Sequence, residues 1–261
     1  MSGAEGLDMD IKISYPDTAF SIPQMTELVK AVTAARVDAI IAQGNEDSEY
    51  ISALNAASEN GILIAFVDTD IDGFSKRLYV GTDNYAAGRF IAEKLIEIVD
   101  GITNVAVLMG ANGFPSLDSR LEGLRDGIAD NDTIRLLVVE LTDFDAIKTI
   151  EKYRSIMNEK PDVNAIICLD GSGGAAIASE IGPSDPSAAT ILCFGYGLGV
   201  RRAIRNGIIA GTIVQSETEM GEKAVQALYE CIKGQQPLPD VIYTDISFIT
   251  SAELGDSVNE Y

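Results

Sequence analysis

The chain has 261 residues, 46% of them hydrophobic, and its 40 acidic and 19 basic side chains give a formal net charge of −21. This length and apolar content suffice for a buried core, in one large domain or in two lobes. The negative charge repels phosphate backbones and anionic lipid headgroups, and no basic patch offsets it, so we expect no nucleic-acid partner. The chain contains no histidine, which excludes Ser-His-Asp, Cys-His and His-zinc mechanisms.

The cysteines and the longer uncharged stretches carry little functional signal. Cys168, Cys193 and Cys231 are too few and too scattered for a disulfide framework or a zinc site. The first two stand in apolar runs, so we interpret them as buried, inert thiols. The longest run without charged residues, 101–117, contains polar residues and a proline, which argues against a membrane-spanning helix. Residues 1–10 have neither the basic head nor the apolar core of a secretory signal.

Short apolar runs alternate along the chain with amphipathic segments of helix length. This pattern is typical of parallel sheets covered by helices on both faces. We expect strands at 11–15, 39–43, 63–68, 78–81, 104–109, 134–140, 165–169, 191–194 and 208–214. We expect helices at 22–35, 48–59, 85–99, 116–129, 143–158, 174–180, 199–206 and 219–233. A break at 100–103 predicts two α/β lobes rather than one long sheet.

The residues that follow each expected strand form the candidate site, because ligands of open parallel sheets bind at the carboxyl ends of the strands. These residues are Asp17, Gln43, Asp68 to Asp70, Asp83, Asn84, Gly110 to Asp118, Asp143, Phe144, Asp170 to Gly174, Gly195, Tyr196 and Gln215. The set is polar, rich in carboxylates and nearly free of cations.

Four segments, in order along the chain, carry a resemblance to a known family. They are 79–89 (YVGTDNYAAGR), 119–123 (SRLEG), 142–145 (TDFD) and 211–215 (GTIVQ), the last followed by MGEKAV from Met220. In these segments the chain resembles the type I periplasmic sugar-binding proteins, the ribose-binding-like solute receptors of ABC importers, which share their fold with the effector domain of LacI-type repressors.

The resemblance implies two doubly wound parallel-sheet lobes joined by a hinge and closing on one small polar ligand. The N-terminal lobe would hold residues 1–100 plus 217–240, and the C-terminal lobe 101–216 plus 241–261. Members of the family begin with a strand and a helix ahead of the strand expected at 11–15, so the first βα unit is expected to be missing.

The resemblance also implies which residues bind the ligand. The positions that match the family's ligand-facing residues, or stand directly beside them, are Gln43, Asp68, Thr69, Asp118, Phe144, Asp170, Gly195, Tyr196 and Gln215. Thr69 and Asp118 stand where the family usually has arginines, and Asp170 and Gly195-Tyr196 stand where it usually has Asn and Asp. We therefore expect a site poor in cations, for a sugar, a cyclitol or an amino-bearing analogue.

Several motifs with precedents in enzymes or metal sites have weaker support. Residues 68–73 (DTDIDG) spell the opening of a calcium loop, but Tyr79 stands where the bidentate glutamate belongs. The glycines of 171–174 lack the spacing of a dinucleotide fingerprint and follow Asp170, which repels phosphate. Segment 229–233 matches a Tyr-x-x-x-Lys spacing without any cofactor glycines. Paired carboxylates serve a glycosidase only at the right separation, which sequence does not give.

We therefore predict a non-enzymatic, extracytoplasmic solute receptor with no catalytic residues, metal or cofactor. It would be a monomer, periplasmic or anchored as a lipoprotein, and would present its ligand to the membrane permease of an ABC importer. Two alternatives stay open: the effector domain of a LacI-type regulator or membrane sensor, and a nucleotide-using α/β enzyme.

Overall fold

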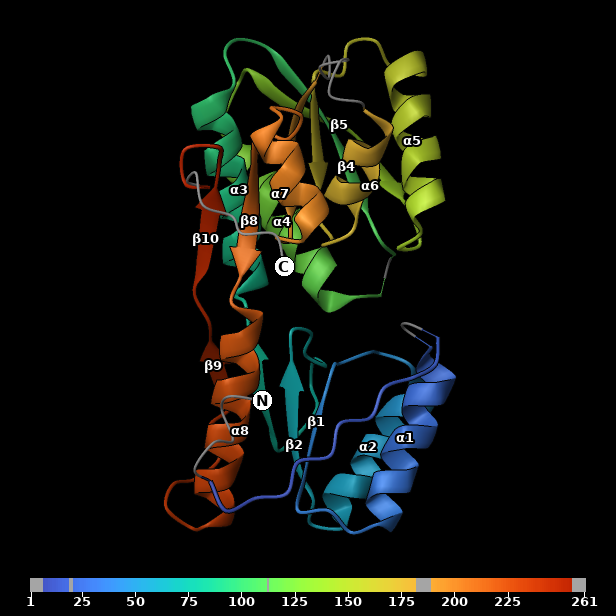
Figure 1. Cartoon of the computed structure of the whole chain (residues 1–261), viewed down its shortest axis with the longest axis vertical. Helices are drawn as coiled ribbons and strands as arrows, with labels where there is room; N and C mark the ends of the chain where they lie inside the picture. Colours follow the sequence, from blue (N-terminus) through green and yellow to red (C-terminus); the bar gives the residue numbers. More distant parts are fainter. Residues whose placement is uncertain (1–6, 19–20, 112, 182–188, 255–261) are drawn as a thin grey trace. The chain divides into compact units, whose positions relative to one another are not determined.

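The protein divides into two compact units, each built on a largely parallel sheet (Figure 1). The computed structural model describes residues 7–18, 21–111, 113–181 and 189–254. Unit 1 consists of Met1–Thr82, Gly113–Ser116 and Ser216–Asp245. Unit 2 consists of Asp83–Asn112, Leu117–Gln215 and Ile246–Tyr261. The expected α/β class with parallel sheets is confirmed.

The sheet of unit 1 has four parallel strands in the order β1-β2-β3-β9. The strands are β1 (Ala39–Ala42), β2 (Leu63–Val67), β3 (Arg77–Gly81) and β9 (Val241–Tyr243). The helices are α1 (Ile22–Ala34), α2 (Ser48–Glu59) and α8 (Glu217–Ile232).

The core of unit 1 lies on both faces of this sheet. On one face, Ile64 and Phe66 of β2 pack in a cluster with Leu54 of α2. On the other face, Ala65 of β2 packs in a cluster with Ala224 of α8. All five side chains are fully buried. Successive residues of a strand point to opposite faces, so the continuous apolar run of β2 is what a doubly covered strand requires.

The sheet of unit 2 has six strands in the order β10-β8-β7-β6-β4-β5, with β10 antiparallel to β8 and the other pairs parallel. The strands are β4 (Thr103–Met109), β5 (Ile134–Leu141), β6 (Ala165–Cys168), β7 (Thr190–Phe194), β8 (Gly211–Gln215) and β10 (Ile246–Ile249). The helices are α3 (Asn84–Ile98), α4 (Pro115–Ile128, whose first two residues belong to unit 1), α5 (Ala146–Glu159), α6 (Gly173–Glu180) and α7 (Leu198–Arg205).

The central strands of unit 2 are also buried on both faces. Ile166 of β6 belongs to a cluster with Ile177 of α6 and Val200 of α7. Ile167, the next residue of β6, points to the opposite face and is fully buried as well. The strand ends of β6 are thus held rigidly, which positions the residues that follow them.

Helix α3 belongs to unit 2, which differs from the expected boundary after residue 100. The reason is a close helix contact through glycines: a Cβ on Gly88 would lie 2.1 Å from the Arg120 carbonyl oxygen of α4, and one on Gly123 would lie 2.1 Å from the Tyr85 carbonyl oxygen of α3. The Tyr85 hydroxyl also donates to an Asp126 carboxylate oxygen at 2.7 Å. Without side chains at these glycines, α3 and α4 pack backbone to backbone.

The strand expected at 11–15 is not formed, and this prediction was wrong. The segment contains no strand, and Ile13 and Tyr15 are 64% and 79% exposed. Among the described residues, β1 is an edge strand of the unit 1 sheet and pairs only with β2. Alternating apolar residues predict a strand only where a neighbouring strand accepts the ladder, and that neighbour is not local in sequence. Strands β9 and β10 were not expected from the sequence, because both are short and many of their side chains are partly exposed.

Within the described ranges, no helix has both the length and the apolar content to cross a membrane.

Candidate functional site

In unit 1, the residues that follow β1 and β2 contact each other. Gln43 comes directly after β1 and its Nε2 donates to Asp68 Oδ2 at 2.6 Å. Asp68 comes directly after β2, which pairs in parallel with β1, so the two side chains leave the sheet at one edge. The Gln43 carbonyl oxygen accepts from the Tyr50 hydroxyl at 2.9 Å, and burial raises the pKa of Tyr50 to about 12. Tyr50 therefore stays a hydrogen-bond donor across the physiological range.

The backbone of Asp68 adopts an unusual conformation. Its φ of 64° lies in the left-handed region, which costs free energy for a residue with a side chain, although least for Asp and Asn. The Asp68 backbone N–H donates to the Val80 carbonyl oxygen at 3.2 Å, and the Asp68 carbonyl oxygen accepts from the Tyr79 hydroxyl at 3.0 Å. These contacts to β3 hold the carboxylate at the sheet edge.

Thr69 and Asp70 are occupied by contacts within unit 1. Thr69 is buried, and its hydroxyl lies 3.1 Å from the Ser116 hydroxyl and 3.4 Å from Asp68 Oδ2. Asp70 accepts from Arg77 Nε at 2.8 Å and forms an ion pair with the same guanidinium. In the described part of the chain, no three His, Cys, Asp or Glu side chains are grouped to hold a metal ion.

In unit 2, Asp170 follows β6 as a buried carboxylate with one unpartnered oxygen. Its Oδ1 accepts from the backbone N–H groups of Ser172 and Gly173 at 2.9 and 3.0 Å, and from the Ser172 hydroxyl. Its Oδ2 is buried and has no hydrogen-bond partner among the described residues, although the residue is only 4% exposed. A buried carboxylate oxygen without a donor is costly, so this oxygen is available to accept a hydrogen bond from a bound molecule.

The same arrangement argues against the phosphate cradle considered for 171–174. The two backbone N–H groups at the start of α6 already donate to Asp170 Oδ1. A phosphate there would compete with that carboxylate and be repelled by it.

Arg120 contacts the backbone just before Asp170 and was missed by the sequence analysis. The residue is 4% exposed. Nη1 donates to the Leu169 carbonyl oxygen and Nε donates to Asn84 Oδ1, both at 2.8 Å. Its guanidinium carbon lies 4.3 Å from the centre of the Phe194 ring. Arg120 thus places a cation from α4 near the end of β6, although the residues that directly follow the strands remain nearly free of cations. The signal was the arginine of the 119–123 segment, which was used for the resemblance but not as a site residue.

Phe144 is held at the end of the sheet by a strained backbone. It and Asp143 have φ values of 57° and 52°, which is rare for such residues and typical of functional sites. A Cβ on Gly110, just after β4, would lie 2.1 Å from the Phe144 ring, so the ring covers that glycine. The Asp143 backbone N–H donates to the Gly110 carbonyl oxygen at 2.7 Å. This geometry presents an aromatic ring at the same edge as Asp170.

The remaining predicted residues occupy different surroundings. Tyr196 is 37% exposed and lies 5.3 Å from the Arg201 guanidinium carbon, measured to the ring centre. Gln215 ends β8 and is half-buried. Asp118 is exposed, two positions before the buried Arg120 on α4. Side chains two positions apart on a helix point to different sides, so the structure does not bring Asp118 together with Arg120.

The interpretation of Cys168 and Cys193 as buried and inert is confirmed. Both are fully buried free thiols, paired in register on β6 and β7. Burial raises the pKa of Cys193 to about 12 and that of Cys168 well above its usual value. Since the thiolate is the reactive form, neither thiol is a nucleophile at neutral pH.

The fold and the strand-end residues together define a two-unit parallel α/β protein of the ligand-binding class. The chain belongs to the periplasmic binding protein domain family, whose profile matches residues 3–236. This confirms the resemblance found in the sequence.

Curated relatives include sugar-binding proteins of bacteria and archaea. The D-allose-binding periplasmic protein of Escherichia coli is 21% identical over 192 residues, covering 70% of this chain and 62% of the relative. The xylose/arabinose-binding protein XylF of Sulfolobus acidocaldarius is 24% identical over 251 residues, covering 91% and 62%. The chain thus spans about three fifths of the length of these relatives.

Solved structures cover more of the chain. GanP, a glucose-galactose binding protein from Geobacillus stearothermophilus, has a TM-score of 0.91 and 29% identity, covering 97% of this chain and 90% of that one. A solute-binding protein from Actinobacillus succinogenes with bound D-allose has a TM-score of 0.84 at 22% identity, covering 97% and 90%, which shows a shared fold.

Proposed function

We propose that this protein is a non-enzymatic, extracytoplasmic receptor for a monosaccharide. The observation that carries the proposal is the buried Asp170 Oδ2, which has no hydrogen-bond partner among the described residues and follows in sequence the Leu169 carbonyl that accepts from Arg120. The proposal is supported by family membership and by relatives whose names include allose, xylose, arabinose, glucose and galactose.

The chemistry of these residues suits a polyol. A sugar hydroxyl donates to a carboxylate and accepts from a guanidinium, and such charge-assisted hydrogen bonds are stronger than neutral ones. The apolar C–H face of a pyranose or furanose packs on an aromatic ring such as Phe144. The Gln43–Asp68 pair of unit 1 offers the same amide and carboxylate chemistry.

We further propose that the receptor is a monomer, periplasmic or anchored as a lipoprotein. Its partner would be the membrane permease of an ABC importer, with no nucleic-acid partner. Family membership and the names of the relatives support the periplasmic location and the role in import, and a net charge of −21 disfavours nucleic acid.

The proposal is tested with a thermal-shift screen of the full chain, followed by calorimetric titration of each hit. The panel holds allose, ribose, xylose, arabinose, glucose and galactose, together with a cyclitol, amino sugars, nucleosides and nucleotides. At least one monosaccharide should raise the melting temperature, and the hit should be lost or weakened in Asp170→Asn but not in the exposed control Asp132→Asn. A response to nucleosides or nucleotides alone would overturn the proposal.

A further inference from the structure

Gly110 follows β4, and its lack of a side chain leaves the space in which the Phe144 ring lies. The three heavy atoms nearest to a Cβ built on Gly110 all belong to that ring, at 2.1 to 2.4 Å. Carbon atoms in contact are about 3.5 to 4.0 Å apart, so the ring lies directly on the Gly110 backbone. The φ of Gly110 is not positive, unlike that of Gly113 or Gly195. The backbone at position 110 would therefore accept a side chain, and it is the ring that requires a glycine there.

The backbone that carries the ring adopts a costly conformation. Asp143 and Phe144 are consecutive and both left-handed, with φ values of 52° and 57°, and each such residue raises the free energy of the folded state. Among the described residues other than glycine, they are the only two chain neighbours with positive φ. Strain of this kind persists only where the surroundings fix it, and it concentrates at functional sites.

Contacts on both sides fix the strained turn. Thr142 is fully buried, and its backbone N–H and hydroxyl both donate to the Met109 carbonyl oxygen, at 2.9 and 3.2 Å. After the turn, Asp145 caps α5 by accepting from the Lys148 backbone N–H at 2.8 Å. The Asp143 carboxylate accepts from Lys148 Nζ at 2.7 Å. The strained residues are thus held between the end of β4 and the start of α5.

We propose that Gly110 and Asp143 are positioning residues of the sugar site. Gly110 supports the Phe144 ring from behind, and the left-handed backbone at Asp143 keeps the ring there. A ring that is fixed before binding loses little conformational freedom when the C–H face of a sugar packs on it. The strain lowers the stability of the unbound protein, as is common at binding sites. This inference rests on the proposed receptor function, because the ring has this role only if a sugar packs on it.

The first test is Gly110→Ala, with Gly221→Ala as the matched control. The added methyl displaces the Phe144 ring, which is partly exposed and can move. A Cβ on Gly221 of α8 would meet no neighbouring atom within 4 Å. The probe is whichever of allose, ribose, xylose, arabinose, glucose and galactose binds the wild type most tightly. Calorimetric titration should show a loss of affinity of about tenfold in Gly110→Ala and none in Gly221→Ala. Wild-type affinity in Gly110→Ala would overturn the proposal.

Two variants separate the backbone of Asp143 from its charge. Asp143→Gly removes the left-handed strain and frees the ring, so affinity should fall about threefold while the melting temperature stays constant or rises. Asp143→Asn keeps a residue type that tolerates the left-handed region and loses only an exposed ion pair of little worth, so it should bind as the wild type does. Equal losses in both variants would show that the charge matters and not the backbone.

The control for the relief of strain lies in unit 1. Arg36 has a φ of 56° and is exposed just after the end of α1. Arg36→Gly removes the same kind of strain away from the site, so the melting temperature should stay constant or rise and sugar affinity should not change. A loss of affinity equal to that of Asp143→Gly would overturn the role given to the Asp143 backbone.

The position of the ring is read directly by NMR of protein with isotopically labelled phenylalanine, in which Phe144→Leu assigns the ring signals. Gly110→Ala should shift these signals in the free protein, and unchanged signals would overturn the role given to Gly110. When the sugar binds the wild type, ring currents should move its C–H protons upfield, and this shift should shrink in Gly110→Ala. A stacked ring is required for that signature, so a merely structural role of Gly110 would leave it unchanged.

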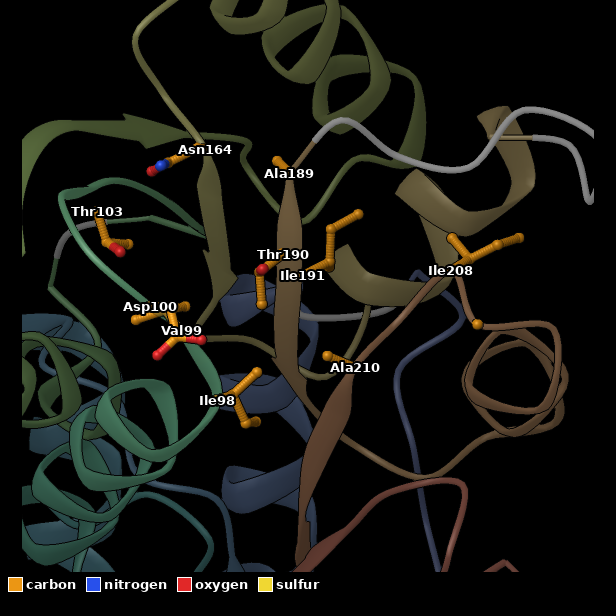
Figure 2. A pocket seen from close by; sticks show the side chains of 11 residues that line it. Ile98, Val99, Asp100, Thr103, Asn164, Ala189, Thr190, Ile191, Ile208 and Ala210 are labelled. Atoms are coloured by element: carbon orange, nitrogen blue, oxygen red, sulfur yellow. The ribbon is translucent and has the colours of Figure 1, made fainter.

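Backbone amide spectra of the same samples separate this site from the other end of the sheet. A cavity of about 450 Å³ lies there, lined among others by Thr103, Thr190 and Ala210 (Figure 2). Thr103 begins β4 and Gly110 follows its end, so at about 3.3 Å per residue the two places are about 23 Å apart. Sugar-induced shifts confined to the cavity would overturn the proposal. If no sugar binds the wild type, the receptor function fails, while the ring signals of the free protein still decide the role of Gly110.

Discussion

The two units present similar residue types at their strand ends but treat them differently. In unit 1 the polar side chains satisfy one another: Gln43 donates to Asp68, and Asp70 pairs with Arg77. In unit 2, Asp170 keeps a buried oxygen without a donor, and Arg120 is fixed by backbone, side-chain and ring contacts. A fixed, unsatisfied site loses little entropy on binding and gains a missing hydrogen bond. We therefore expect unit 2 to contribute more to affinity than unit 1.

The largest effect should come from Arg120→Met. The change removes a buried guanidinium and leaves Asn84 Oδ1 and the Leu169 carbonyl oxygen without their donor, so sugar affinity should fall about a hundredfold, or about 2.7 kcal/mol. The free energy of unfolding should fall by about 2 kcal/mol. Calorimetric titration and chemical denaturation measure the two effects. Arg125→Met, on the exposed side of the same helix, is the control, and equal affinity loss in both variants would contradict the assignment.

Asp170→Asn should separate binding from stability. Asparagine keeps an oxygen that accepts from Ser172 and Gly173, while an amide NH₂ group replaces Oδ2, the carboxylate oxygen that has no donor. Sugar affinity should therefore fall at least tenfold, or about 1.4 kcal/mol. The free energy of unfolding should stay constant or rise, because a polar group kept unsatisfied for binding lowers the stability of the unbound protein. A variant that loses stability but binds normally would show that Asp170 serves only to cap α6.

Asp68→Asn should have a smaller effect, because Gln43 and solvent already satisfy the carboxylate. Asparagine tolerates the left-handed backbone, so the change tests the charge alone, and we expect a loss of affinity of about fivefold to tenfold. Asp70→Asn is the matched control: it breaks the ion pair with Arg77 and should lower stability without changing affinity. Should the two variants bind alike, unit 1 would have no specific contact through Asp68.

The smallest expected effect is a pH dependence of stability that comes from a buried core thiol and not from the binding site. The folded state raises the pKa of Cys193 from 9.0 to about 12 through burial, so the thiol contributes stability that is fully present below pH 9 and is lost as pH rises toward 12. Cys193→Ala should flatten this part of the curve of unfolding free energy against pH. Sugar affinity below pH 9 should be the same in both proteins. An unchanged slope would mean that another group carries the alkaline loss.

The positions of most helices and strands followed from local patterns. The apolar runs at 39–43, 63–68 and 165–169 predicted β1, β2 and β6, because a strand covered on both faces needs an apolar side chain at nearly every position. Since polar residues end these runs, Gln43, Asp68 and Asp170 were found without coordinates. The segment 11–15 has an equally regular pattern but forms no strand, because a ladder depends on a partner elsewhere in the chain.

The sequence by itself determined the α/β class, the family and three of the strand-end polar residues, since these depend on composition, periodicity and short motifs. Only the tertiary structure decided that Arg120 donates to the Leu169 carbonyl oxygen, that Thr69 is buried against Ser116, and that α3 packs with α4 through Gly88 and Gly123. These features join residues distant in the chain. The acidity of the chain is likewise a sequence property, but the tertiary structure brings the buried Arg120 to the Leu169 carbonyl oxygen, because that contact depends on the packing of α4 against the end of β6.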